Sequence, residues 1–168
     1  MKSRNIIRKT IALCLVLAGI LSPSTSMAEL AKDFSLAGAG NSTVNLQDYR
    51  GKIVYLDFWA SWCLPCLQSF PWMDDIQAKY QDQGFEVLAV NLDSAKDDAE
   101  EFLLDNPIDF IVAFDPDGRT PEEYGVIGMP SSFLIDRNGE IVSSHVGFNS
   151  SFKEEFEETL EQLLEQQP

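Results

Sequence analysis

Two cysteines lie two residues apart in the segment FWASWCLPCLQSFP, residues 58–71. A disulfide between Cys63 and Cys66 would close a very short loop, and disulfides stabilise a fold mainly by closing long loops. A structural zinc site needs four ligands, and this pair supplies only two. The spacing therefore favours a redox-active pair over a structural disulfide or a zinc site.

The elements around the pair indicate how the two sulfurs would differ. The nearly continuous apolar run Ile53–Trp59 is typical of a strand buried on both faces, and residues 64–83 are predicted to form a helix. Cys63 would then lie at the helix N-terminus, where free amide groups and the helix dipole lower the pKa of a thiol. Pro65 is tolerated there because a first-turn N–H has no helical partner. We expect Cys63 to be the exposed nucleophile and Cys66, shielded one turn further along, to resolve the mixed disulfide.

Asp57 is the one charged residue in the run Ile53–Trp59. Its apolar neighbours predict burial, which would raise the pKa of its carboxyl towards neutrality. A carboxylate with such a pKa can accept the thiol proton of Cys66. The alternative, a carboxylate at a strand end that faces water, stays open from the sequence alone.

The remaining patterns predict an α/β fold. Alternating strands and helices give parallel strands first, and a late hairpin around the turn at residues 136–139 adds an antiparallel edge. We therefore predict a mixed central sheet flanked by helices, with an N-terminal β-hairpin extension. The further predicted elements are the hairpin strands 34–36 and 43–46, strands 85–92, 110–114, 132–135 and 141–146, helices 94–105 and 120–124, and a last helix begun by a Ser151–Glu154 capping box.

The N-terminus predicts a secretory signal peptide over residues 1–28. Four basic residues precede the eleven-residue apolar run IALCLVLAGIL, and the small residues of SMA then offer a cleavage site. The run is shorter than the ~20 residues of a membrane-spanning helix, although an uncleaved anchor is the alternative. Cys14 would leave with the signal. Residues 29–168 would form one domain with a single pair of thiols, periplasmic or secreted.

Charge and weaker motifs exclude several other functions. Residues 29–168 carry eight Lys and Arg against 27 Asp and Glu, a net charge of −19, which disfavours nucleic acids and anionic lipid surfaces. Residues 115–118, DPDG, lack the third acid and the terminal Glu of a calcium loop, so we predict a turn. His145 is the only histidine, and we expect it to be a surface residue on a strand.

The segment DFWASWCLPC resembles the active-site segment of the thioredoxin superfamily. Pro71, five residues after Cys66, matches the kink proline of its first long helix. The stretches LQDYRGK, VLAVNLD and GMPSSFLID are similar to TlpA/ResA-like thiol-disulfide oxidoreductases, which are secreted and often tethered to a membrane. The resemblance runs from about residue 34 to the C-terminus. It implies electron transfer to oxidised cysteines outside the cytoplasm, including those of apocytochrome c.

The resemblance also implies further site residues. A cis peptide bond at Met129-Pro130 would face the cysteines, with the backbone of Met129 aimed at an incoming strand, and Trp62 would contact the substrate. Ser69 departs from this branch, which usually has a glutamate three residues after the second cysteine. Strongly oxidising members carry a histidine between the cysteines, and Leu64-Pro65 lacks it. We therefore favour the reducing direction.

We expect an extracytoplasmic enzyme that reduces protein disulfides, with Cys63, Cys66, Asp57 and Pro130 as catalytic residues. No organic cofactor and no metal are expected beyond the redox-active disulfide itself. The expected partners are oxidised client proteins and a membrane thiol donor that supplies electrons, and the chain is expected to be a monomer. The alternative is a copper-binding or metallochaperone module of the same fold, in which Met129 or His145 would join the two cysteines.

Overall fold

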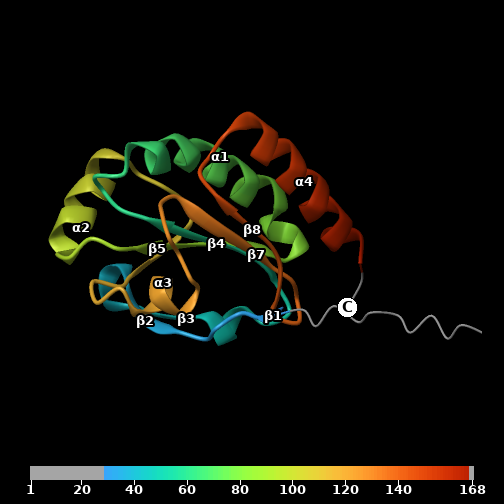
Figure 1. Cartoon of the computed structure of the whole chain (residues 1–168), viewed down its shortest axis with the longest axis horizontal. Helices are drawn as coiled ribbons and strands as arrows, with labels where there is room; N and C mark the ends of the chain where they lie inside the picture. Colours follow the sequence, from blue (N-terminus) through green and yellow to red (C-terminus); the bar gives the residue numbers. More distant parts are fainter. Residues whose placement is uncertain (1–28, 167–168) are drawn as a thin grey trace, which may run out of the picture.

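Residues 29–166, which the computed structural model describes, form an eight-stranded sheet covered on both faces (Figure 1). The predicted signal peptide, with Cys14, lies outside the described residues. The strand order is β1-β8-β7-β4-β5-β6-β2-β3. The strands are β1 Glu29–Leu30, β2 Ser35–Gly38, β3 Thr43–Asn45, β4 Ile53–Trp59, β5 Phe85–Asn91, β6 Ile111–Phe114, β7 Ser131–Ile135 and β8 Glu140–Val146.

The sheet is mixed, as the sequence predicted. β4, β5 and β6 are parallel neighbours, whereas β7 pairs antiparallel with β4 and with β8. The N-terminal hairpin is not a separate appendage, because β2 pairs antiparallel with β6 and so extends the sheet. β4 therefore lies in the interior of the sheet and ends at the cysteine segment.

Four α-helices cover the sheet unequally. They are α1 Leu64–Tyr80, α2 Lys96–Asp105, α3 Arg119–Glu123 and α4 Ser150–Glu165. Figure 1 shows α1 and α4 together over one face, with α3 and the β2–β3 hairpin on the other. Within residues 29–166, no helix is long and apolar enough to cross a membrane.

Alternation along β4 divides the apolar interior into two cores. Tyr55 and Trp59 belong to the core under α1 and α4, together with both cysteines. Val54, Leu56 and Phe58 point the other way, into the core under the hairpin. Side chains in a strand alternate between faces, so Asp57 must share the face of Tyr55 and Trp59.

The structure corrects two predicted helix starts and adds one strand. Helix α4 is capped by Asn149, whose side chain accepts a hydrogen bond from the N–H of Phe152 at 3.0 Å, so the predicted Ser151–Glu154 capping box is wrong. Helix α2 begins at Lys96 rather than at residue 94, because Ala95 is still extended. Strand β1, which the sequence did not predict, pairs with the start of β8.

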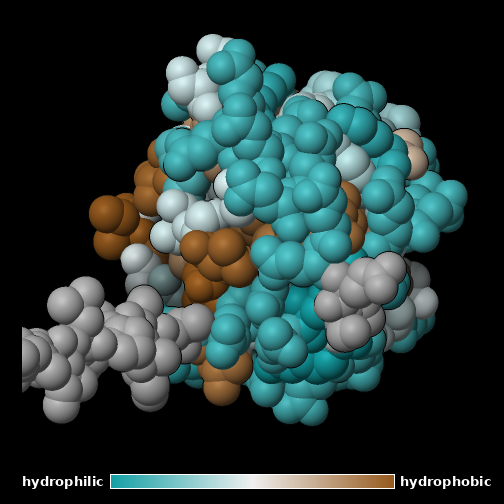
Figure 2. Space-filling view, turned by 90° about the vertical axis from the view of Figure 1, so that its right-hand side faces the viewer, coloured by the Kyte–Doolittle hydropathy of each residue, from teal (hydrophilic) through white to brown (hydrophobic). Residues whose placement is uncertain are grey.

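Exposed large apolar side chains gather in two regions, with Leu104 standing apart on α2. One region is the β1–β8 edge, where Leu30 and Val142 are exposed, whereas Val146 lies at the opposite end of β8, beside Gly128. Figure 2 faces this side of the molecule and shows brown patches within a mostly hydrophilic surface. The other region surrounds the cysteines. Much of the remaining visible surface in Figure 2 is hydrophilic, in keeping with the acidic composition.

Candidate active site

A disulfide joins Cys63 to Cys66 at the start of α1, with Cα atoms 5.3 Å apart. Cys63 is the N-cap residue, and its carbonyl accepts from the N–H groups of Cys66 at 2.9 Å and Leu67 at 3.3 Å. Pro65 lies in the first turn, where it removes no helical hydrogen bond. The Cys63 sulfur therefore lies at the positive end of a 17-residue helix, which stabilises a thiolate once the disulfide is reduced.

The two sulfurs differ in access. Cys63 lines an open depression of about 490 Å³ together with Trp62, Leu64, Pro65, Gly128 and Met129, and Cys66 is not part of this lining. Cys63 is only 5% exposed and Cys66 0%, so in the disulfide form the access to Cys63 is confined to this opening. The walls of the depression cover most of the Cys63 side chain. A partner can still reach Cys63 there, and it cannot reach Cys66.

The rim of this depression is apolar. Trp62 and Leu64 are 69% and 72% exposed, and Ile127, two residues before Met129, is 91% exposed. Every residue that lines the depression is uncharged, in a chain with a large excess of acids. Such a surface suits an apolar segment of another protein.

The loop before Cys63 is held by Asp93, a residue to which the sequence reasoning gave no role. Its carboxylate accepts from the N–H and the hydroxyl of Ser61, both at 3.0 Å, and from the Asn91 amide at 2.7 Å. The N–H of Leu92 also donates to the carbonyl of Trp59 at 2.9 Å. The polar pair Asn91 and Asp93 at the end of a buried strand was the available signal, but the contact with Ser61 spans 32 residues.

Asp57 is 0% exposed, as its apolar neighbours predicted. The Tyr55 hydroxyl donates to one carboxylate oxygen at 3.4 Å, and the other oxygen has no hydrogen-bond partner among the described residues. Burial raises the pKa of Asp57 well above its usual range, and the hydrogen bond from Tyr55 offsets this only in part. The carboxyl shares the strand face of Tyr55 and Trp59, which packs against the helix that carries both cysteines.

Ser69 does not replace the glutamate that this branch usually has. Its side chain is buried, and its hydroxyl donates to the carbonyl of Cys66 at 2.7 Å. The hydroxyl is thus engaged with the backbone of its own helix. Asp57 is left as the buried carboxylate on the sheet face that packs against the cysteines.

The Met129-Pro130 peptide bond is cis, as the resemblance implied. Met129 lines the depression beside Cys63, whereas Pro130 is buried behind it. The carbonyl of Pro130 accepts from the N–H of Gly147 at 2.8 Å, and the Ser131 hydroxyl donates to the carbonyl of Gly128 at 2.6 Å. These bonds fix the Met129 segment against β8.

His145 lies away from the lining of this depression. It is half-buried rather than on the surface as predicted, because its ring stacks on Phe152 with centroids 4.3 Å apart. Across residues 29–166 no cluster of three or more His, Cys, Asp or Glu side chains is placed to hold a metal ion. A metal bound at the cysteines would have those two sulfurs and at most the Met129 thioether near it.

Comparison with known proteins points to one chemistry. The sequence model of the family named Redoxin matches residues 27–163. The thiol-disulfide oxidoreductase ResA of Geobacillus thermodenitrificans is 35% identical over 150 residues, which cover 83% of this chain and 86% of that protein.

Two solved structures extend the comparison to the fold. A Chlorobium tepidum protein described as a thiol:disulfide interchange protein DsbE is 55% identical, with a TM-score of 0.79 over 82% of this chain and 96% of that one. The exposed lipoprotein thioredoxin Etrx1 of Streptococcus pneumoniae is 38% identical, with a TM-score of 0.65 over 79% of this chain and 100% of that one.

Proposed function

The chain belongs to the Redoxin family and is a thiol-disulfide oxidoreductase, and on that premise we propose that it reduces disulfides of client proteins outside the cytoplasm. The observation that carries the proposal is the difference in access between the two sulfurs. Cys63 opens onto an apolar depression at a helix N-terminus, and Cys66 is closed off behind it. A nucleophile and a shielded resolving thiol need this arrangement.

The reaction runs in two exchanges. In the reduced protein, the Cys63 thiolate attacks one sulfur of a client disulfide, a Cys63–client bond forms, and the other client sulfur leaves as a thiolate that takes up a proton. Asp57 then accepts the thiol proton of Cys66, whose thiolate attacks the Cys63 sulfur. The Cys63–Cys66 bond forms, and the second client sulfur leaves as a thiolate that takes up a proton. The client gains two electrons, and the dithiol loses two.

The reducing direction is supported by the residues between the cysteines. Leu64 and Pro65 place no histidine there to stabilise the reduced thiolate, and a strong oxidant depends on such stabilisation. A reductase must be reduced again, and we propose a membrane thiol donor for this step. The signal predicted in residues 1–28 supports a location outside the cytoplasm. The redox-active disulfide serves as the only cofactor, in a monomer.

Residues at the rim of the depression bind the client. Trp62, Leu64 and Met129 offer apolar contacts to side chains that flank a client cysteine, and Met129 lines the same depression as Cys63. Pro130 lacks an N–H, so no donor at that position competes for the sulfurs. We propose that clients bind as extended segments along this rim.

Trapping tests the reductase proposal. A Cys66→Ser variant keeps the nucleophile and lacks the resolving thiol, so it should accumulate mixed disulfides with oxidised clients in the extracytoplasmic fraction. Cys63→Ser is the matched control and should trap nothing. Equal trapping by both variants, or none by either, would overturn the proposal. A reduced protein that binds copper tightly but exchanges no disulfide would favour the copper-binding alternative.

The redox potential tests the direction separately. Equilibration against glutathione should give a value nearer to about −270 mV, as in thioredoxin, than to about −120 mV, as in strong oxidants. After reduction, iodoacetamide near neutral pH should modify Cys63 much faster than Cys66. A potential near the oxidising limit would make the protein an oxidase, and equal alkylation rates would remove the assigned roles.

A further inference from the structure

A row of polar side chains crosses three strands under α1 and α4. Asp57 on β4 lies opposite Ser132 on β7, and Ser132 lies opposite His145 on β8. Directly opposed residues of antiparallel strands point to the same face, with Cβ atoms about 4.5–5.5 Å apart. The three side chains therefore form one line from the core at Asp57 to the β8 edge.

Tyr55 links the inner members of the row. Its hydroxyl donates to Asp57 at 3.4 Å and also interacts with the Ser132 hydroxyl. Burial and the Asp57 carboxylate raise the pKa of Tyr55, whereas the contact with Ser132 lowers it. The phenol thus remains neutral and able both to accept and to donate a proton.

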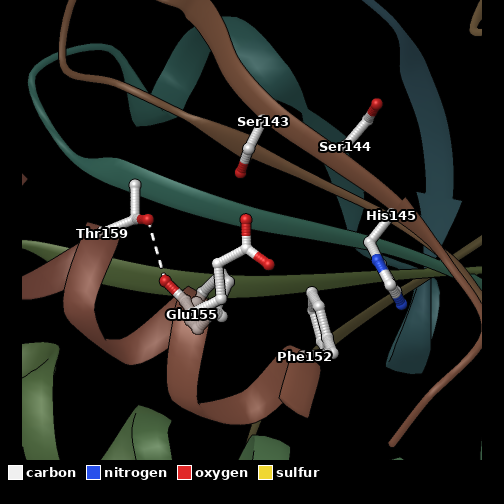
Figure 3. A pocket seen from close by; sticks show the side chains of 7 residues that line it. Ser143, Ser144, His145, Phe152, Glu155 and Thr159 are labelled. Atoms are coloured by element: carbon white, nitrogen blue, oxygen red, sulfur yellow. Dashed lines mark hydrogen bonds between the residues drawn. The ribbon is translucent and has the colours of Figure 1, made fainter.

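His145 forms the outer end of the row. Figure 3 shows its ring beside that of Phe152, near a small cavity of about 50 Å³ that Ser143, Glu155 and Thr159 also line. The Nε2 atom of His145 is buried and has no hydrogen-bond partner among the described residues, although the side chain as a whole is half-exposed. This imidazole therefore bridges the interior and the solvent.

Two of the three buried side-chain polar atoms without partners in residues 29–166 mark the ends of this row. They are Asp57 Oδ2 and His145 Nε2, and the third is Trp59 Nε1. Buried polar atoms are nearly always paired, so unpaired atoms at both ends of one row need an explanation. Aromatic rings pack around the inner part of the row. The rings of Trp72 and Phe156 pack edge-on against Tyr55, with ring centroids 5.6 and 4.9 Å from that of Tyr55. Asp57, Tyr55 and Ser132 are buried, so His145 is the member of the row that reaches solvent.

We propose that Asp57, Tyr55, Ser132 and His145 form the route by which the proton taken from Cys66 leaves the protein. The inference rests on the proposed role of Asp57 in the reductase reaction. Each resolution step leaves one proton on Asp57, which must depart before the next turnover. The two hydroxyls each accept one proton and donate one, with no net change, and the His145 imidazole takes up one proton and releases one to solvent. No electrons move along this route.

Few other charges face the route. Glu155 of α4 is the acid that lines the cavity beside His145, and Ser143 and Thr159 are neutral there. At the inner end, the hydrogen-bond partner of Asp57 is the Tyr55 hydroxyl. His145, Tyr55 and Ser132 act as positioning and relay residues, since none of them touches the reacting sulfurs.

The first test removes the Tyr55 hydroxyl. Tyr55→Phe keeps the ring and its aromatic packing, and it should slow resolution of a preformed Cys63 mixed disulfide about tenfold near neutral pH and change its pH profile. Alkylation of Cys63 should be unchanged. Tyr80→Phe is the matched control, because the Tyr80 hydroxyl is in the same layer but donates to Glu161 at 2.8 Å. It should resolve at the wild-type rate.

The second test uses His145→Ala with imidazole added to the buffer. This variant should slow resolution, and imidazole should restore the rate, because a free base can carry the proton but cannot repair packing. Ser144→Ala on the same strand should behave as wild type with or without imidazole. A slow His145→Ala variant that imidazole fails to restore would overturn the role of His145.

Wild-type rates and pH profiles in both Tyr55→Phe and His145→Ala would overturn the whole route. His145 is half-exposed, so its variant still decides the matter if Tyr55→Phe proves unstable in a denaturant melt. Trapping by Cys66→Ser does not depend on the route. Failure of the route is therefore distinguishable from failure of the proposed reductase function.

Discussion

The two faces of β4 bury different kinds of side chain. Towards the hairpin, Val54, Leu56 and Phe58 lie in a core built mainly of apolar side chains. Towards α1 and α4, the same strand buries a tyrosine, an aspartate and a tryptophan, and two of these three side chains have polar atoms without partners. Burying an unpaired polar group lowers stability, so stability does not explain the second face. The disulfide lies on that face, and its chemistry does explain it.

The largest expected effect is on the apolar face. Phe58 is fully buried, and its ring lies 5.6 Å from Tyr124 and 5.9 Å from Phe133. Phe58→Ala should reduce the free energy of unfolding by about 3–5 kcal/mol, because it removes buried area and leaves a cavity. Urea melts measure the loss.

The folded fraction of Phe58→Ala should still exchange disulfides at the wild-type rate, since Phe58 points away from the cysteines. Val142→Ala is a control on the exposed edge, where Val142 is 43% exposed, and it should change stability little. A loss of exchange in folded Phe58→Ala would show that the two faces are not independent.

A smaller loss is expected at Asp93, a buried acid whose partners are all present. Asp93→Ala leaves the Ser61 N–H and the Asn91 amide without their acceptor and should reduce the free energy of unfolding by about 1–3 kcal/mol. Asp93→Asn keeps one acceptor oxygen and should lose less. Denaturant melts measure the free energy of unfolding of both variants. An equal loss in the two would mean that hydrogen bonding by the Asp93 side chain does not contribute to stability at this position.

Substitution of Asp57 should raise the stability of the fold rather than lower it, and it should slow the reaction. Asp57→Asn should slow resolution by Cys66 about tenfold or more near neutral pH, because the proton acceptor is lost. It should also raise the free energy of unfolding, because an unpaired buried carboxyl is removed. Stopped-flow exchange and urea melts report the two effects. Resolution at the wild-type rate would remove Asp57 from the mechanism.

The stability gain in Asp57→Asn should depend on pH. Burial raises the pKa of Asp57 in the folded protein, so the unfolded chain ionises first as pH rises and the wild type loses stability through that range. Below about pH 4, the usual range of an aspartate, both states hold the proton and the gain should vanish. Melts at several pH values test this, and a gain that does not change with pH would contradict it.

Local patterns were enough to predict much of this fold. The limits of β4 follow from its nearly continuous apolar run. The presence of the hairpin follows from Gly and Asn between two short strands, although β2 begins and ends later than predicted. The N-cap of α4 was mispredicted because Asn149 and Ser151 are both good caps. Which of them is used depends on which side chain reaches the N–H of Phe152, and spacing alone does not decide that.

The site was predictable only as far as its chemistry is local. Cys63, Cys66 and the buried Asp57 lie within ten residues of one another, in one strand and the turn after it. The contact of Asp93 with Ser61 and the stacking of His145 on Phe152 join distant segments, so they depend on how the elements pack. Such contacts decide how a loop is held and where a proton can travel.

The smallest effect is expected at Ser69, which tests whether Asp57 acts alone. The Ser69 hydroxyl donates to the Cys66 carbonyl at 2.7 Å, and that carbonyl also lies within a helix whose backbone supplies donors. Ser69→Ala removes one side-chain bond without leaving a charge or a large cavity, so the free energy of unfolding should fall by about 0.5–1.5 kcal/mol at most. The rate of resolution should not change, because the hydroxyl faces the backbone rather than a proton acceptor. A clear slowing in stopped-flow exchange, in a variant that melts like the wild type, would mean that Ser69 has inherited part of the role of the missing glutamate. In that case the polar face of β4 would not account for proton transfer by itself.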